Sequence, residues 1–205
     1  MPLVETDWLE KNLDNIKVVD CSWHMPLTKR NGLEEYKIKH ILNATFFDLD
    51  DNSKKDTDLP HMLVKKKEWE KIISKMGIKE NDEIVIYDSS DVVSSCRCWY
   101  NLIYFGHDPK LVHILNGGLE KWVKEKREVT ADLPKIQISE YKGFEKKELV
   151  KNKASINQNI NSQRFNLIDA RSKERFEGKI KELTTDELQV VLENIFKPKK
   201  PSKKS

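Results

Sequence analysis

The chain has 205 residues, a formal net charge of +3, and 35% charged against 38% hydrophobic residues. Its five Trp, five Tyr and seven Phe argue against a disordered chain. No run approaches the roughly 18 apolar residues of a membrane-spanning helix, and the first residues lack the apolar core of a secretion signal. We therefore expect a globular protein without a membrane partner, in a reducing compartment that is most simply the cytoplasm.

Short apolar runs and helical patterns alternate along the first 130 residues. The runs are rich in β-branched residues and bounded by polar residues or glycine, as buried strands are. The predicted strands are residues 16–20, 44–47, 84–87 and 112–115. The helical patterns place apolar side chains on one face and end at glycines such as Gly77 and Gly106. The first predicted helix begins at Thr6 or Asp7. Three further predicted helices cover residues 64–76, 94–105 and 118–126.

This alternation predicts an α/β fold over residues 1–130, with a parallel sheet and helices on both of its faces. Residues 131–160 are polar and rich in Lys and Asn, so we interpret them as a linker that wraps the domain. Residues 165–169 predict a new strand, because they run from apolar residues into an Asp and a turn, as residues 18–22 do. Residues 182–205 predict an amphipathic helix from Thr184 and a basic tail.

The charge and cysteine patterns exclude several classes of protein. Five lysines and no acid lie in residues 197–205, so the rest of the chain is slightly acidic and we expect no nucleic-acid partner. Cys96 and Cys98 are separated by one residue, not by the two-residue gap of zinc and redox motifs. No histidine lies at metal-ligand spacing from a cysteine or an acid, and the four aspartates of residues 50–58 lack calcium-loop spacing. We expect no disulfide scaffold, no metal and no cofactor.

Six segments of the first 130 residues, and one further segment, carry a resemblance to a known family. They are residues 19–26, 44–50, 57–63, 86–90, 105–107, 115–122 and 167–178. In this order they resemble the two-domain rhodanese-type sulfurtransferases, most closely those of the 3-mercaptopyruvate type. The resemblance implies a complete rhodanese-like domain over residues 1–130 and the remnant start of a second over residues 161–181. It also implies transfer of sulfur from 3-mercaptopyruvate, or thiosulfate, to a thiol acceptor, and it allows a mitochondrial location.

Sulfur transfer of this kind needs a cysteine thiolate at the end of a central strand, where backbone N–H groups and a helix N-terminus stabilise the anion. In the family that cysteine opens a Cys-Gly-x-Gly-x-Thr loop in the second domain, and these 205 residues contain no such loop. Asp88 occupies the nucleophile position of the first domain, directly after the predicted strand at residues 84–87. Because a carboxylate carries no persulfide and repels an anionic donor, we predict no catalytic residue here and a non-catalytic copy of the domain.

Two arginines are candidate substrate-binding residues. By resemblance, Arg171 matches an arginine of the substrate-binding surface between the domains, and Arg175 follows it in the same motif. A guanidinium can hold the carboxylate of an α-keto acid with two hydrogen bonds. Without the cysteine loop, these arginines can equally be remnants. Arg97 matches an arginine at the start of a family helix, and we interpret it as structural or interdomain.

Two interpretations of the function stay open at this point. The chain is either a sulfurtransferase-family protein or a catalytically inactive, truncated rhodanese-like module with a binding or structural role. We interpret the three cysteines, Cys21, Cys96 and Cys98, as packing residues, with a relocated nucleophile as the alternative. A protein partner that completes the second domain is compatible with either function.

Overall fold

The computed structural model describes residues 2–180, which fall into a first unit, residues 1–150, and a second unit from residue 151 onward. The first unit is built on a five-stranded sheet of order β1-β6-β5-β2-β4, in which all neighbouring strands run parallel. Its strands are β1 (Leu3–Val4), β2 (Lys17–Asp20), β4 (Thr45–Phe46), β5 (Ile84–Tyr87) and β6 (Val112–Leu115). The four predicted strands are therefore confirmed, and β1 was missed.

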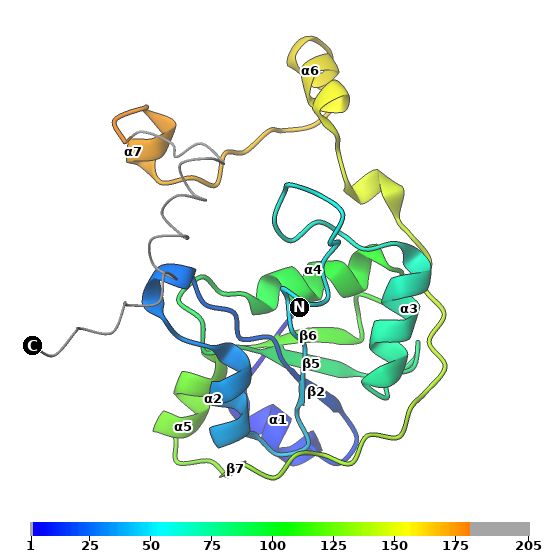
Figure 1. Cartoon of the computed structure of the whole chain (residues 1–205), viewed down its shortest axis with the longest axis vertical. Coiled ribbons are helices and arrows are strands. Elements are labelled where there is room, and N and C mark those ends of the chain that lie inside the picture. The colour runs from blue at the N-terminus through cyan, green and yellow to red at the C-terminus, as the bar shows by residue number, and fades with distance from the viewer. Residues whose placement is uncertain (1, 181–205) are drawn as a thin grey trace, which may run out of the picture. The chain divides into compact units, whose positions relative to one another are not determined.

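Helices cover both faces of this sheet (Figure 1). One face carries α1 (Thr6–Asn12), α2 (Gly32–Ile38) and α5 (Gly118–Lys124), and the other carries α3 (Lys66–Lys75) and α4 (Ser95–Tyr104). The smaller elements are β3 (His40–Ile41) and β7 (Val129–Thr130), which pair antiparallel, and the 3-10 helices η1 (Pro26–Thr28) and η2 (Lys147–Leu149). The predicted α/β fold is confirmed. Among residues 2–180, no helix is both long and apolar enough to cross a bilayer, and the compartment stays a prediction.

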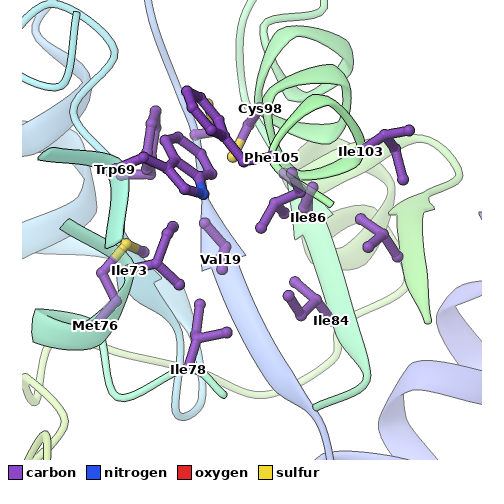
Figure 2. Packing of buried hydrophobic residues seen from close by; sticks show 14 of the residues in the cluster. Val19, Trp69, Ile73, Met76, Ile78, Ile84, Ile86, Cys98, Ile103 and Phe105 are labelled. Atoms are coloured by element: carbon purple, nitrogen blue, oxygen red, sulfur yellow. The ribbon is translucent and has the colours of Figure 1, made fainter. Parts of the chain in front are cut away.

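The core between the sheet and the α3–α4 face is built around two stacked aromatic rings (Figure 2). The rings of Trp69 and Phe105 lie 4.6 Å apart with an interplanar angle of 12°. Ile84 and Ile86 of β5 point into this cluster, and Val19 of β2 lies beside them. Because side chains alternate along a strand, the other residues of β5 face the second core, under α1, α2 and α5.

Residues 131–150 run along the first unit without forming part of its main sheet. The N–H of Ser139 donates to the carbonyl of Ser74 over 3.0 Å, and the N–H of Phe144 donates to the carbonyl of Phe105 over 2.9 Å. Gly106 permits this approach: it has φ +93°, and a Cβ there would lie 2.8 Å from the carbonyl oxygen of Phe144. This course fits the predicted wrapping segment, whereas the division of the chain at residue 130 stays a prediction.

The second unit contains α6 (Lys153–Ser162) and α7 (Lys173–Phe176) in its described part. Helix α6 was missed inside the predicted linker, although Asn152 caps it by accepting the N–H of Ser155. The strand predicted at residues 165–169 is wrong, because these residues form no strand and the side chains of Leu167 and Ile168 are 64% and 84% exposed. An apolar run makes a strand only where neighbouring strands bond to it. The helix predicted from Thr184 and the basic tail lie outside the described residues.

Candidate functional site

Asp88 is the first residue after β5, and its carboxylate closes the start of α4. Its Oδ2 accepts the N–H of Ser95 over 2.6 Å, and its Oδ1 accepts the N–H of Ser90 over 3.2 Å. Ser95 is the first residue of α4, so its N–H is one of the donors that a helix leaves unpaired, at the end that favours negative charge. The carboxylate thus fills the place in which this helix could hold an anion. That this place corresponds to the nucleophile position stays a prediction.

The rest of the Asp88 loop, residues 88–94, also bonds its polar groups within the first unit, to the segment after β2 and to the loop itself. The N–H of Ser89 donates to Oγ of Ser22 over 2.9 Å, and Oγ of Ser94 donates to the carbonyl of Cys21 over 2.6 Å. The N–H of Val93 bonds to the carbonyl of Ser90. Val93 has φ +51°, which is uncommon for a β-branched residue and shows how tightly the loop turns. The loop is therefore closed by bonds to the segment after β2 and by a bond within itself.

A cavity of about 820 Å³ adjoins the Asp88 loop, between α2 and α5 at the carboxyl edge of the sheet. Asp20, Glu35 and Asp88 contribute carboxyl groups to its lining. Asp20 ends β2 beside the end of β5 and is only 1% exposed. Burial raises the pKa of Asp20 to about 6, and the nearby charge of Asp88 adds to this rise, while hydrogen bonds from Ser22 oppose it. The cavity therefore disfavours an anionic ligand near its carboxylates.

Glu35 is held in the cavity wall by two basic side chains. Nε and one Nη of Arg30 donate to its two carboxylate oxygens over 2.8 and 2.7 Å. Nε2 of His24 lies 3.1 Å from Oε2 of Glu35. The Arg30 guanidinium holds the pKa of Glu35 below its ordinary value, so this carboxylate stays charged and paired.

A second polar group of residues, the Asp50 cluster, consists of Trp23, Asp50, His61 and Arg97. Nε2 of His61 lies 2.7 Å from Oδ1 of Asp50, and Nε1 of Trp23 donates to Oδ2 of Asp50 over 3.0 Å. The bond to His61 is the main reason that the pKa of Asp50 lies below its ordinary value. Nδ1 of His61 has no hydrogen-bond partner in residues 2–180, and the side chain is partly exposed. A carboxylate that orients an imidazole in this way prepares it to move a proton.

Sequence reasoning missed this cluster. Metal-ligand spacing between histidines and acids does not reveal it, because the structure pairs His61 with Asp50 across a loop with no regular spacing. Two further pairs also lack metal-ligand spacing: His24 and Glu35 are 11 positions apart, and His113 and Glu83 are 30 positions apart. In residues 2–180, no group of three or more His, Cys, Asp or Glu side chains is arranged to hold a metal ion.

The three cysteines are poorly placed for nucleophilic chemistry. Cys21 and Cys98 are buried, and burial raises the pKa of the Cys21 thiol well above its ordinary value. Cys96 is exposed at the start of α4, but partial burial of its thiol and the charge of Asp88 raise its pKa as well. Because the thiolate is the reactive form, Cys21 and Cys96 are weak nucleophiles near neutral pH, and burial shields Cys98 from a sulfur donor.

Arg171 and Arg175 belong to the second unit. The guanidinium of Arg171 holds both carboxylate oxygens of Asp169 at 2.7 to 3.0 Å, and this contact lowers the pKa of Asp169 to about 2. Arg175 lies in α7, where its N–H bonds to Oγ of Ser172. A substrate-binding role for either arginine stays a prediction.

Comparison with known proteins agrees with this geometry. Residues 5–125 match the family described as the rhodanese-like domain. The chain is 36% identical over 200 residues to thiosulfate/3-mercaptopyruvate sulfurtransferase 1, mitochondrial, of Arabidopsis thaliana, across 86% of the chain and 52% of the relative. It is 31% identical over 186 residues to the thiosulfate sulfurtransferase of Rattus norvegicus, across 86% of the chain and 61% of the relative.

A solved structure gives the same result. The 3-mercaptopyruvate sulfotransferase SseA of Escherichia coli superposes with a TM-score of 0.81 at 27% identity, over 90% of this chain and 71% of SseA. The chain spans only about half to three fifths of the length of the curated relatives named above. The family expected from the sequence is confirmed, and the chain belongs to the rhodanese family.

Proposed function

We propose that this chain takes part in the transfer of sulfur from 3-mercaptopyruvate or thiosulfate to a thiol acceptor, with its first unit as the rhodanese domain that does not carry the sulfur. The observation that carries this proposal is the bond between Asp88 and the N–H of Ser95 at the start of α4. The carboxylate fills the anion position of the helix and cannot form a persulfide. Relatives named for both sulfur donors support the reaction class.

The sulfur must then travel on a cysteine that this chain does not provide. In the reaction a thiolate attacks the sulfur of 3-mercaptopyruvate, the carbon–sulfur bond breaks, and a persulfide and the enolate of pyruvate result. With thiosulfate the leaving group is sulfite. The thiols of Cys21, Cys96 and Cys98 are buried or have raised pKa values, so we place the persulfide on a cysteine outside these 205 residues.

The first unit contributes proton transfer in this proposal. The enolate that leaves the sulfur takes up a proton to become pyruvate. His61 is oriented by Asp50 and leaves Nδ1 unpaired within the described residues, which suits it to hold and deliver that proton. The Asp50 cluster thus contributes chemistry that the Asp88 loop does not.

The first test measures sulfide release from 3-mercaptopyruvate with a thiol reductant, using the purified chain. We expect no turnover, and no persulfide on any cysteine when the protein is alkylated and its mass is measured. The control is the triple variant Cys21→Ser, Cys96→Ser and Cys98→Ser. Turnover that disappears in this control would place the nucleophile in the chain and overturn the proposal.

A second experiment tests whether the first unit supports turnover. In a chimera, residues 1–150 replace the matching part of SseA, so that the catalytic remainder of SseA supplies the cysteine. We expect the chimera to release sulfide faster than that remainder alone, and His61→Asn to reduce the rate of the chimera about 100-fold. A chimera that folds, as judged by circular dichroism, but shows no dependence on His61 would refute the proton-transfer role.

The alternative function is an inactive module that binds a ligand or partner. The cavity of about 820 Å³ beside Asp88 is the observation that favours it, because its volume lies in the range of small-molecule sites. A chimera that folds yet stays inactive would favour this alternative.

A further inference from the structure

Arg97 connects helix α4 to the loop that carries His61. An Nη of its guanidinium donates to the carbonyl oxygen of His61 over 2.6 Å. Because the donor is charged, this bond is stronger than one between two neutral groups. Arg97 lies in the first turn of α4, so a regular helix, and not another loop, is the support for His61.

His61 needs such a support because of its backbone conformation. Its φ is +52°, in the left-handed region that is unfavourable for a residue with a side chain. It lies between β4 and α3, in a segment without strand or helix, and its neighbours Leu59 and Met62 are exposed. The carbonyl of Met62 accepts the N–H of Lys54 over 2.8 Å, so the backbone is held just after His61, and the contacts of the Asp50 cluster hold His61 itself.

Packing alone does not account for Arg97. Its Nε is buried and has no hydrogen-bond acceptor among the residues that the structure describes. Burial also lowers the pKa of Arg97, which means that the surroundings disfavour its charge. An apolar side chain of similar length would avoid both costs. The contact that the guanidinium provides, and that an apolar residue does not, is the bond to His61.

With this left-handed backbone, the His61 imidazole contacts the other two members of the cluster, Trp23 and Asp50. The ring of Trp23 stands edge-on to the imidazole, with 4.9 Å between the ring centroids, while its Nε1 bonds to Asp50. Asp50 accepts from Trp23 and His61 on different oxygens, so a shift of the imidazole breaks one bond without replacing it.

We propose that Arg97 is a positioning residue for His61, whose carbonyl it holds so that the imidazole meets Asp50 and Trp23. When the bond from Arg97 is removed, the left-handed turn relaxes and the imidazole leaves Oδ1 of Asp50. The value of this positioning for sulfur transfer rests on the proposed function, whereas the positioning itself is a property of the chain alone.

The test compares three variants of the full chain. Arg97→Met keeps a side chain of similar length and removes the donors. His61→Ala defines complete loss of the imidazole. Lys55→Met removes a cation outside the cluster, which acts on Asp50 through its charge and through a hydrogen bond of 3.0 Å to the Asp50 backbone carbonyl. The first readout is the pKa of Asp50 from the NMR titration of its carboxyl carbon. The second is the rate at which diethyl pyrocarbonate modifies His61, followed by peptide mass spectrometry.

We expect Arg97→Met to raise the pKa of Asp50 nearly as far as His61→Ala does, and to speed the modification of His61 about tenfold. Lys55→Met should raise the pKa less and leave the modification rate unchanged. Arg97→Lys, which retains one charged donor, should give intermediate values and serves as the test if Arg97→Met does not fold. Wild-type values for both readouts in a folded Arg97 variant would overturn the proposal. Neither readout uses a sulfur donor. The positioning role of Arg97 can therefore fail while the proposed function stands, and the proposed function can fail while the positioning role stands.

Discussion

Two carboxylates at the carboxyl edge of the same sheet are used in opposite ways. Asp88 accepts one backbone N–H from its own loop and one from the first residue of α4, and thereby closes the start of that helix. Asp50 accepts from two side chains, and one of these, His61, keeps its second ring nitrogen unpaired within the described residues. A carboxylate that faces backbone donors fixes a loop, whereas one that faces an imidazole leaves a group able to exchange protons.

The comparison separates two requirements of sulfur transfer within one domain. An anionic sulfur donor needs a positive field. At the start of α4, the carboxylate of Asp88 already neutralises that field. A leaving carbon needs a proton, which the Asp50 cluster supplies in the function proposed above. In that proposal the first unit assists a persulfide and does not form one.

The largest expected effect concerns Asp20, the buried neighbour of Asp88. Burial raises its pKa to about 6, so the folded protein binds this proton more tightly than the unfolded chain does. The free energy of unfolding therefore falls as the pH rises from about 4 to 6. A shift of about two units corresponds to roughly 3 kcal/mol. We expect Asp20→Asn to raise the free energy of unfolding by about 3 kcal/mol at pH 7.5, and by about 1 kcal/mol at pH 4.5.

Urea unfolding at both pH values measures this difference. Two phenols face Asp20, those of Tyr36 and Tyr87. Their pKa values are raised, so both stay neutral throughout this pH range. Asp50 provides the contrast: its pKa is lowered, so its contribution is present above its unfolded pKa and is lost as the pH falls through the folded one. An Asp20→Asn effect that does not grow with pH would show that burial does not control this carboxyl.

The next effect tests the closed loop directly. Asp88→Ala leaves the N–H of Ser95 at the buried start of α4 without its acceptor, and we expect a loss of about 2 kcal/mol in the free energy of unfolding. Asp88→Asn retains an acceptor and should lose less than half of this. The matched control is Asp91→Ala, at an exposed residue of the same loop. Equal effects at positions 88 and 91 would mean that the carboxylate does not hold the helix.

The sequence allowed the frame of the fold to be predicted, because the runs of β2, β5 and β6 are apolar and bounded by turn residues. Helix α2 was missed since it begins at Gly32, a weak helix former, and depends on the Asn31 side chain that accepts the N–H of Glu34. The apolar run at residues 165–169 was interpreted as a strand from its likeness to residues 18–22. A strand, however, requires neighbours that local sequence does not encode.

The candidate site divides in the same way. Asp88 could be found from the sequence because it follows a strand directly, at a position that chain order alone defines. Asp50 and His61 are eleven positions apart in an irregular loop, and their pairing depends on a left-handed turn at His61. No periodicity indicates such a pair, so only the folded loop brings the two side chains together.

Replacing the carboxylate of Asp88 by another group should open the start of α4 to an anion. In Asp88→Cys, the introduced thiol lies at the start of α4, where the N–H of Ser95 and the helix dipole stabilise a thiolate. We expect iodoacetamide to alkylate it at pH 7 about tenfold faster than Cys96, because partial burial of the Cys96 thiol still raises its pKa when Asp88 is absent. Peptide mass spectrometry over a time course measures both rates in one sample, so Cys96 is the internal control. Equal rates would mean that the start of α4 lacks the field of an anion site, and that Asp88 closes the loop by its hydrogen bonds alone.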